Sequence, residues 1–122
     1  MKTALVIEDN ENNLELITFI LHAGGYGTRC AMTGLDGVAE ALSERPDFIL
    51  LDIQLPDVDG IEVARRIRAA EGWPPIPMIA ITSFAMAGDR ERVLAAGCNG
   101  YIEKPIDPLR VMKQIEDVLA RA

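Results

Sequence analysis

Short apolar runs alternate with amphipathic segments along the whole chain. The runs are rich in Ile, Val and Leu, and they predict strands at residues 3–7, 27–31, 48–52, 78–81 and 100–102. Between them, apolar residues recur at helical spacing and predict helices over residues 12–23, 35–44, 61–70, 89–96 and 108–122. Runs this short and this apolar are typical of strands that are buried on both faces of a parallel sheet.

Strict alternation of strand and helix predicts an α/β fold. We expect a doubly wound, five-stranded parallel sheet with five helices on its two faces. Right-handed crossovers leave few topologies, and of these we expect the strand order 2-1-3-4-5. That order puts the first and third strands at the switch point, where ligands bind in such sheets. The length of 122 residues suits one domain over residues 1–122, with no linker.

Three finer expectations concern packing. In the second helix, Leu35, Val38, Ala39 and Leu42 stand at helical spacing and are predicted to form its buried face. Pro108 is expected in the first turn of the last helix. We expect Trp73, in the proline-rich connector 72–77, to pack against the domain.

Most predicted strands end next to a residue used in phosphoryl chemistry. The first is followed by Glu8 and Asp9, the third ends at Asp52, the fourth is followed by Thr82, and Lys104 follows the last. Because parallel strands share one carboxyl edge, these side chains should line one pocket.

Clustered carboxylates repel one another and require a compensating cation. Mg²⁺ or Mn²⁺ suits oxygen ligands, with Asp9 and Asp52 as direct ligands and Glu8 acting through water. A lysine and a threonine hydroxyl can bind phosphoryl oxygens, and a central carboxylate can itself be the nucleophile.

Composition narrows the choice of partners. The net charge of −7 argues against a general nucleic-acid or anionic-membrane binder. Cys30 and Cys98 lack the spacing of a zinc site and are expected to be buried and reduced. No signal peptide or membrane-spanning run is evident, so we expect a cytoplasmic location.

These motifs together resemble the receiver domain of two-component response regulators over nearly the whole chain. The resemblance rests on the strings Val6-Ile7-Glu8-Asp9-Asn10, Leu51 to Gly60 (LDIQLPDVDG), Ala80-Ile81-Thr82-Ser83 and Tyr101 to Ile106 (YIEKPI). The stretch 85–90, AMAGDR, is also similar to stand-alone receivers of the DivK kind, although receivers of hybrid histidine kinases share it.

The resemblance implies a flavodoxin-like receiver fold and a role for each motif residue. Asp52 would accept a phosphoryl group, and Glu8, Asp9, Asp52 and the backbone carbonyl of Gln54 would hold the metal. Thr82 and Lys104 would contact the phosphoryl group, and Tyr101 would be the switch aromatic. The Lys104–Pro105 bond would be cis, and Gln54 and Phe84 would influence the phosphoryl lifetime.

The expected function is that of a phosphoacceptor without turnover. The donor would be a histidine kinase or a histidine phosphotransfer protein, and the output would be binding of a downstream protein through the face formed by residues 89–96, 100–102 and 108–122. No output domain is expected within residues 1–122, and a monomer or a phosphorylation-dependent dimer would fit. Two alternatives are a Mg²⁺-dependent phosphohydrolase with an aspartyl nucleophile and a phosphate-independent binding module.

Overall fold

The computed structural model describes residues 1–83 and 87–122. Its strands are β1 (Thr3–Ile7), β2 (Gly27–Ala31), β3 (Phe48–Asp52), β4 (Met78–Thr82) and β5 (Gly100–Glu103). They form one parallel sheet in the order β2-β1-β3-β4-β5, which confirms the predicted topology.

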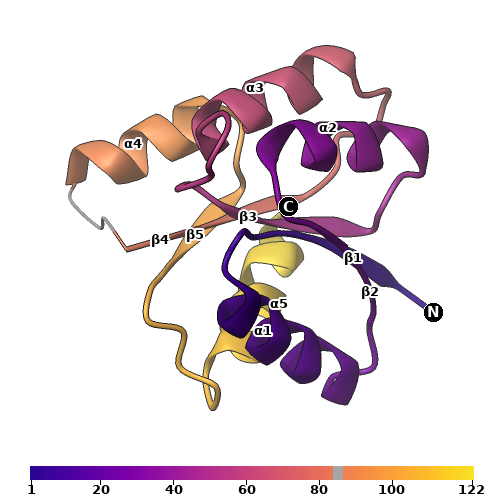
Figure 1. Cartoon of the computed structure of the whole chain (residues 1–122), viewed down its shortest axis with the longest axis vertical. Helices are drawn as coiled ribbons and strands as arrows, with labels where there is room; N and C mark the ends of the chain where they lie inside the picture. The colour runs from indigo at the N-terminus through magenta and orange to yellow at the C-terminus, as the bar shows by residue number, and fades with distance from the viewer. Residues whose placement is uncertain (84–86) are drawn as a thin grey trace.

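Helices cover both faces of this sheet (Figure 1). One face carries α1 (Glu11–Ala23) and α5 (Val111–Arg121), and the other carries α2 (Gly34–Ser43), α3 (Gly60–Ala70) and α4 (Ala87–Ala95). Each face encloses its own apolar cluster, and the central strands β3 and β4 bury every residue between the two. The doubly wound architecture therefore follows from strands that are apolar on both sides.

The predicted buried face of α2 is only partly correct, because Val38 packs against the core but Ala39 is exposed. Leu35 and Leu42 are exposed, whereas Gly34, Gly37 and Ala41 face the domain. A Cβ atom on Gly37 would lie 2.6 Å from Cδ1 of Ile7, so α2 packs too close to the sheet to admit a side chain there. The side of α2 that faces the sheet therefore carries small residues instead of the predicted leucines.

Side chains cap the amino-terminal ends of several helices. Asn10 accepts from the backbone N–H of Asn13 on α1, Thr33 from Asp36 on α2 and Asp59 from Glu62 on α3. Such caps satisfy N–H groups that have no partner within the helix.

One further carboxylate binds α2 from a distance. Asp57, in the loop between β3 and α3, accepts from the N–H groups of Gly34 at 2.7 Å and Leu35 at 2.9 Å. The bond from Leu35, followed by that from Gly34, lowers the pKa of Asp57 to about 2. The loop that follows Asp52 is thereby fastened to a neighbouring helix.

Three other expectations need correction. The helix α5 begins at Val111 rather than at Pro108, because Asp107 accepts from Leu109 and forms a separate turn. Trp73 is 90% exposed, since Ile76 is the connector residue that enters the core. Cys98 is buried as expected, but Cys30 is exposed.

The surface gives two general findings. No helix in the described part of the chain is both long and apolar enough to cross a bilayer.

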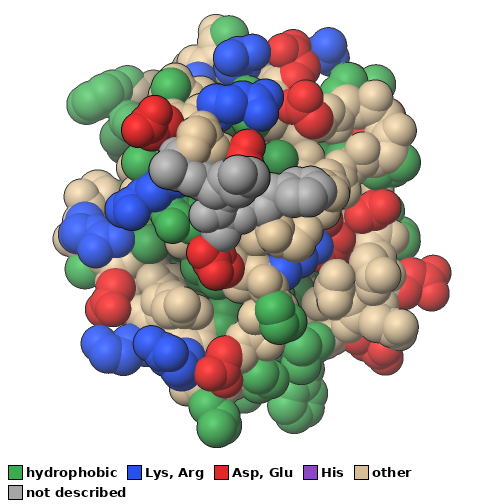
Figure 2. All heavy atoms as spheres, turned by 90° about the vertical axis from the view of Figure 1, so that its left-hand side faces the viewer, with side chains coloured by type: hydrophobic (Ala, Val, Ile, Leu, Met, Phe, Trp, Pro, Cys, Tyr) green, Lys and Arg blue, Asp and Glu red, His purple; other side chains and the backbone are tan. Residues whose placement is uncertain are grey.

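Figure 2 shows the side that carries α4, where acidic and basic side chains are interspersed. This side therefore lacks the single-sign field of a nucleic-acid-binding surface.

The close packing of α2 generates a stability prediction. Replacing a helical glycine by alanine normally stabilises a helix by roughly 1 kcal/mol. For Gly37→Ala we expect the opposite, a loss of about 1–3 kcal/mol in the free energy of unfolding, because three carbons of buried Ile7 lie within 2.9 Å of the new Cβ. Urea unfolding measures the difference. Gly72→Ala, with open space at its Cβ, is the control, and a stabilised Gly37→Ala variant would contradict the packing.

The bond from Asp57 to α2 generates a prediction for pH. Because the folded-state pKa lies below the ordinary value of 3.8, the ionised carboxylate stabilises the fold above that pH and loses its effect as pH falls toward about 2. Asp57→Asn should therefore be less stable than wild type at neutral pH, and the gap should close as the pH falls below about 4. Urea midpoints at a series of pH values, with Glu116→Gln as a surface control, measure this. A gap that stays constant with pH would rule the explanation out.

Candidate functional site

The carboxyl edge of the sheet brings the predicted site residues together. Asp52 and Thr82 are the last residues of β3 and β4, while Glu8 and Lys104 directly follow β1 and β5. The register pairs Ile7 with Leu51, which sets Glu8 beside Asp52. The backbone N–H of Lys104 donates to the carbonyl of Thr82 at 2.8 Å, so the sheet continues into the site.

Three carboxylates converge at this edge. Oxygen atoms of Glu8, Asp9 and Asp52 all lie within 4.8 Å of one another. Asp9 is exposed, but Glu8 and Asp52 are buried, with 5% and 3% of their surface exposed. Burial raises the pKa of Glu8 to about 7, and the neighbouring Asp52 adds to the shift. The cluster is therefore electrostatically unfavourable unless a cation joins it.

Lys104 supplies part of the compensating charge. Its Nζ lies 3.1 Å from Oδ2 of Asp52 and 3.2 Å from Oε1 of Glu8. Burial alone would lower the pKa of Lys104, but the bonds and charges of the two carboxylates outweigh it and raise that pKa. The lysine is thus held in its charged form between the two buried acids. The Lys104–Pro105 peptide bond is cis.

The backbone fixes the direction of the Asp52 carboxylate. Its Oδ1 accepts from the N–H of Gln54 at 3.0 Å, while Oδ2 faces Lys104. The same loop closes where Gly60 donates to the carbonyl of Ile53 at 2.8 Å. A Cβ on Gly60 would lie 2.7 Å from the carbonyl oxygen of Asp52, so only glycine permits this approach.

Two contacts at the site were not anticipated from the sequence. The N–H of Asn10 donates to Oε2 of Glu8 at 3.2 Å. The hydroxyl of Ser83 donates to Oε1 of Gln54 at 2.8 Å and so joins the loops that follow β3 and β4. The sequence shows Ser83 next to Thr82, but it does not indicate the contact with Gln54, which lies 29 residues away.

Thr82 and Tyr101, the residues expected to respond to the phosphoryl group, lie on the adjacent strands β4 and β5. Thr82 is buried at the end of β4, with 3% of its surface exposed. Tyr101 on β5 is half-buried, and the guanidinium carbon of Arg90 on α4 lies 5.2 Å from its ring centroid. Phe84 and positions 85 and 86 lie outside the described residues. Positions 87–90, the rest of the stretch that is similar to DivK-like receivers, are described.

Known proteins are similar to this chain in sequence and in architecture. The family described as the response regulator receiver domain matches residues 4–116. The polar-differentiation response regulator DivK of Brucella anthropi is 42% identical over 121 residues, which cover 99% of this chain and 98% of that protein.

Solved structures of receiver domains have the same fold as this chain. The receiver domain of a sensor histidine kinase from Pseudomonas aeruginosa PAO1, with a magnesium ion coordinated in its active-site cleft, is 35% identical with a TM-score of 0.87 over 98% of both chains. A CheY-like receiver domain protein from Methanospirillum hungatei is 29% identical with a TM-score of 0.89, covering 99% of this chain and 95% of that one. The chain therefore belongs to the response regulator receiver domain family, the phosphoacceptor modules of two-component signalling.

Proposed function

We propose that this receiver accepts a phosphoryl group on Asp52 from a phosphohistidine. The observation that carries the proposal is the position of Asp52 at the centre of the site. One carboxylate oxygen faces the ammonium of Lys104, and two further carboxylates lie within 4.8 Å. The family assignment favours this phosphoacceptor role over a phosphohydrolase or a phosphate-independent module.

The acidic cluster fits a divalent cation with oxygen ligands. We propose that Glu8, Asp9, Asp52 and the backbone carbonyl of Gln54 hold Mg²⁺ or Mn²⁺. Mg²⁺ commonly binds through a small number of carboxylates and completes its shell with water and phosphate oxygens. When bound, the ion would offset the negative charge of the carboxylates and of the incoming phosphoryl oxygens. The P. aeruginosa receiver, with its magnesium ion, supports this assignment.

The transfer itself exchanges one bond for another. An oxygen of Asp52 forms a bond to phosphorus while the bond from phosphorus to the donor imidazole nitrogen breaks, and the electron pair returns to that nitrogen. Lys104 lies within reach of Asp52 and would balance charge on the phosphoryl oxygens. Thr82, at the end of the adjacent strand, would donate its hydroxyl to one of them.

The output would be a change of surface. Movement of Thr82 toward the phosphoryl group would leave space for Tyr101, which lies on the adjacent strand β5 and contacts Arg90 of α4. A local change of charge would thereby alter the face formed by α4, β5 and α5. The donor would be a histidine kinase or a histidine phosphotransfer protein, and a downstream protein would bind the altered face.

Phosphorylation of Asp52 can be tested directly. Intact mass spectrometry of the full chain with Mg²⁺ and acetyl phosphate should show the mass of one added phosphoryl group. Asp52→Asn should gain none, because the nucleophilic carboxylate is lost. Asp57→Asn, in the same loop, should be labelled like wild type because its side chain binds α2 instead. An unlabelled wild type, or labelling of Asp52→Asn, would refute the proposal.

Metal binding gives a separate prediction. Asp9→Asn should weaken binding of Mg²⁺ or Mn²⁺ by about 10- to 100-fold, because one carboxylate of the cluster loses its charge. Titration calorimetry on the unphosphorylated chain measures the affinity without any transfer reaction. Asp36→Asn, in the first turn of α2, is a control for loss of one surface charge. Equal affinities of Asp9→Asn and wild type would place the ion elsewhere.

A further inference from the structure

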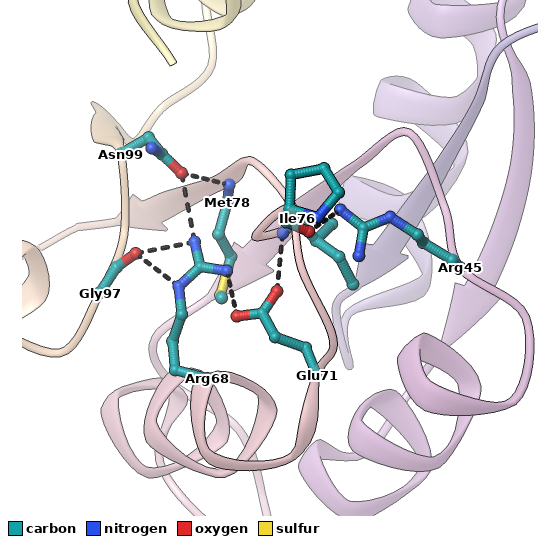
Figure 3. Close-up of polar contacts among 8 residues, drawn as sticks. Arg45, Arg68, Glu71, Ile76, Met78, Gly97 and Asn99 are labelled. Carbon is teal, nitrogen blue, oxygen red and sulfur yellow. Dashed lines mark hydrogen bonds and ion pairs between the residues drawn. The ribbon is translucent and has the colours of Figure 1, made fainter.

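A second polar network lies at the opposite edge of the sheet, at the amino-terminal ends of β4 and β5 (Figure 3). Arg68, in the last turn of α3, donates to the carbonyl of Gly97 from Nε at 3.0 Å and from Nη2 at 2.8 Å. Its Nη1 lies 2.7 Å from Oε2 of Glu71, and Nη2 also reaches Oδ1 of Asn99 at 3.3 Å. Arg68, Glu71, Gly97 and Asn99 are called the Arg68 network below.

This network fastens several backbone segments to one another. Oε1 of Glu71 accepts from the N–H of Ile76 at 2.6 Å, and Oδ1 of Asn99 accepts from the N–H of Met78 at 2.8 Å. The side chain of Glu71 is only 6% exposed. Charge-assisted bonds of this kind are stronger than neutral ones, and here they join α3, the connector before β4 and the turn between α4 and β5.

The fit at Gly97 is close. Its φ of +114° is one that glycine tolerates, and a Cβ there would lie 2.7 Å from Cγ of Arg68. Arg68 therefore packs directly against the backbone at the carboxyl end of α4. The Arg68 side chain thus links this end of α4 to α3.

The described part of the other end of α4 contains fewer buried residues. The buried residues of this region lie late, at Val93, Ala96 and Cys98, whereas positions 88–92 are exposed or half-buried. A groove of about 230 Å³ separates Asp89 and Arg92 from Ile53, Leu55 and Ile61 of the domain. Within the described residues, positions 88–92, the part of α4 nearest Thr82, are thus not buried and have space beside them.

We propose that Arg68 is a positioning residue that makes Gly97 the fixed pivot of α4. This inference rests on the proposed function. A change at Asp52 and Thr82 would move residues 88–92 of α4, with the Arg90–Tyr101 contact, while the Arg68 network keeps the far end in place. Because one end is fixed, the helix moves as a unit about Gly97 instead of separating from the domain.

The experiment uses hydrogen–deuterium exchange of the full chain with and without Mg²⁺ and beryllofluoride, a phosphoryl mimic. In wild type, the mimic should alter exchange at residues 88–92 and at Tyr101 and leave residues 97–99 protected. In Arg68→Ala, exchange at residues 97–99 should rise about tenfold in both states, since bonds to a charged group are lost. The mimic-induced change at 88–92 should fall to roughly half or less, because the pivot is no longer fixed.

Two further variants complete the design. Arg68→Lys keeps the positive charge but cannot donate two hydrogen bonds to the carbonyl of Gly97, so it should show the same defect more weakly. This variant replaces Arg68→Ala in the experiment if Arg68→Ala does not fold. Arg66→Ala, which loses only an exposed pair with Glu62 on the same helix, should behave as wild type.

The outcomes separate the two proposals. Fluorine NMR reports whether the mimic binds. If the wild type fails to bind it, the proposed function fails, and the pivot falls with it. If wild type binds the mimic without a change at 88–92, or if the Arg68 variants keep the full change, the pivot is wrong while the phosphoacceptor role of Asp52 stands.

Discussion

The contact of Lys104 with two buried carboxylates is the constraint around which the site is built. Glu8 and Asp52 lie buried at adjacent strand ends, where their charges repel each other, and Lys104, directly after β5, supplies a positive charge between them. The bridge spans the width from β1 to β5, so it also fixes how the strand ends meet. Asp9 adds a third carboxylate, which leaves the acids in excess of the lysine and supports the proposed binding of a further cation.

The two edges of the sheet are polar in different ways. At the amino edge, the Arg68 network pairs one guanidinium with a carboxylate and backbone oxygens, and most of its groups are satisfied within the protein. At the carboxyl edge, the carboxylates outnumber the compensating lysine, so a bound cation would be needed to balance their charge. A sheet buried on both faces connects these edges rigidly, because every residue of β3 and β4 is packed.

Much of this arrangement could be predicted from local pattern. Strand positions, their order and the gathering of Asp52, Thr82 and Lys104 follow from apolar runs and from the shared edge of parallel strands. The buried face of α2 could not be predicted this way, because hydrophobicity favoured Leu35 and Leu42, while the short distance to Ile7 selected Gly37. The Arg68 network could not be predicted from the sequence either, because Gly97 and Asn99 lie about thirty residues away from Arg68. Such pairings depend on the completed fold rather than on periodicity.

The contrast between the edges explains where a change of charge can have an effect. A phosphoryl group at Asp52 would alter the field at the carboxyl edge, but interactions at the amino edge are already satisfied and lie at the far end of the strands. The strands between them are packed on both faces and resist displacement. The proposed response would therefore be directed into residues 88–92 of α4, which are exposed or half-buried and lie near the site. Rigidity at one edge would give a charge change at the other edge a defined direction.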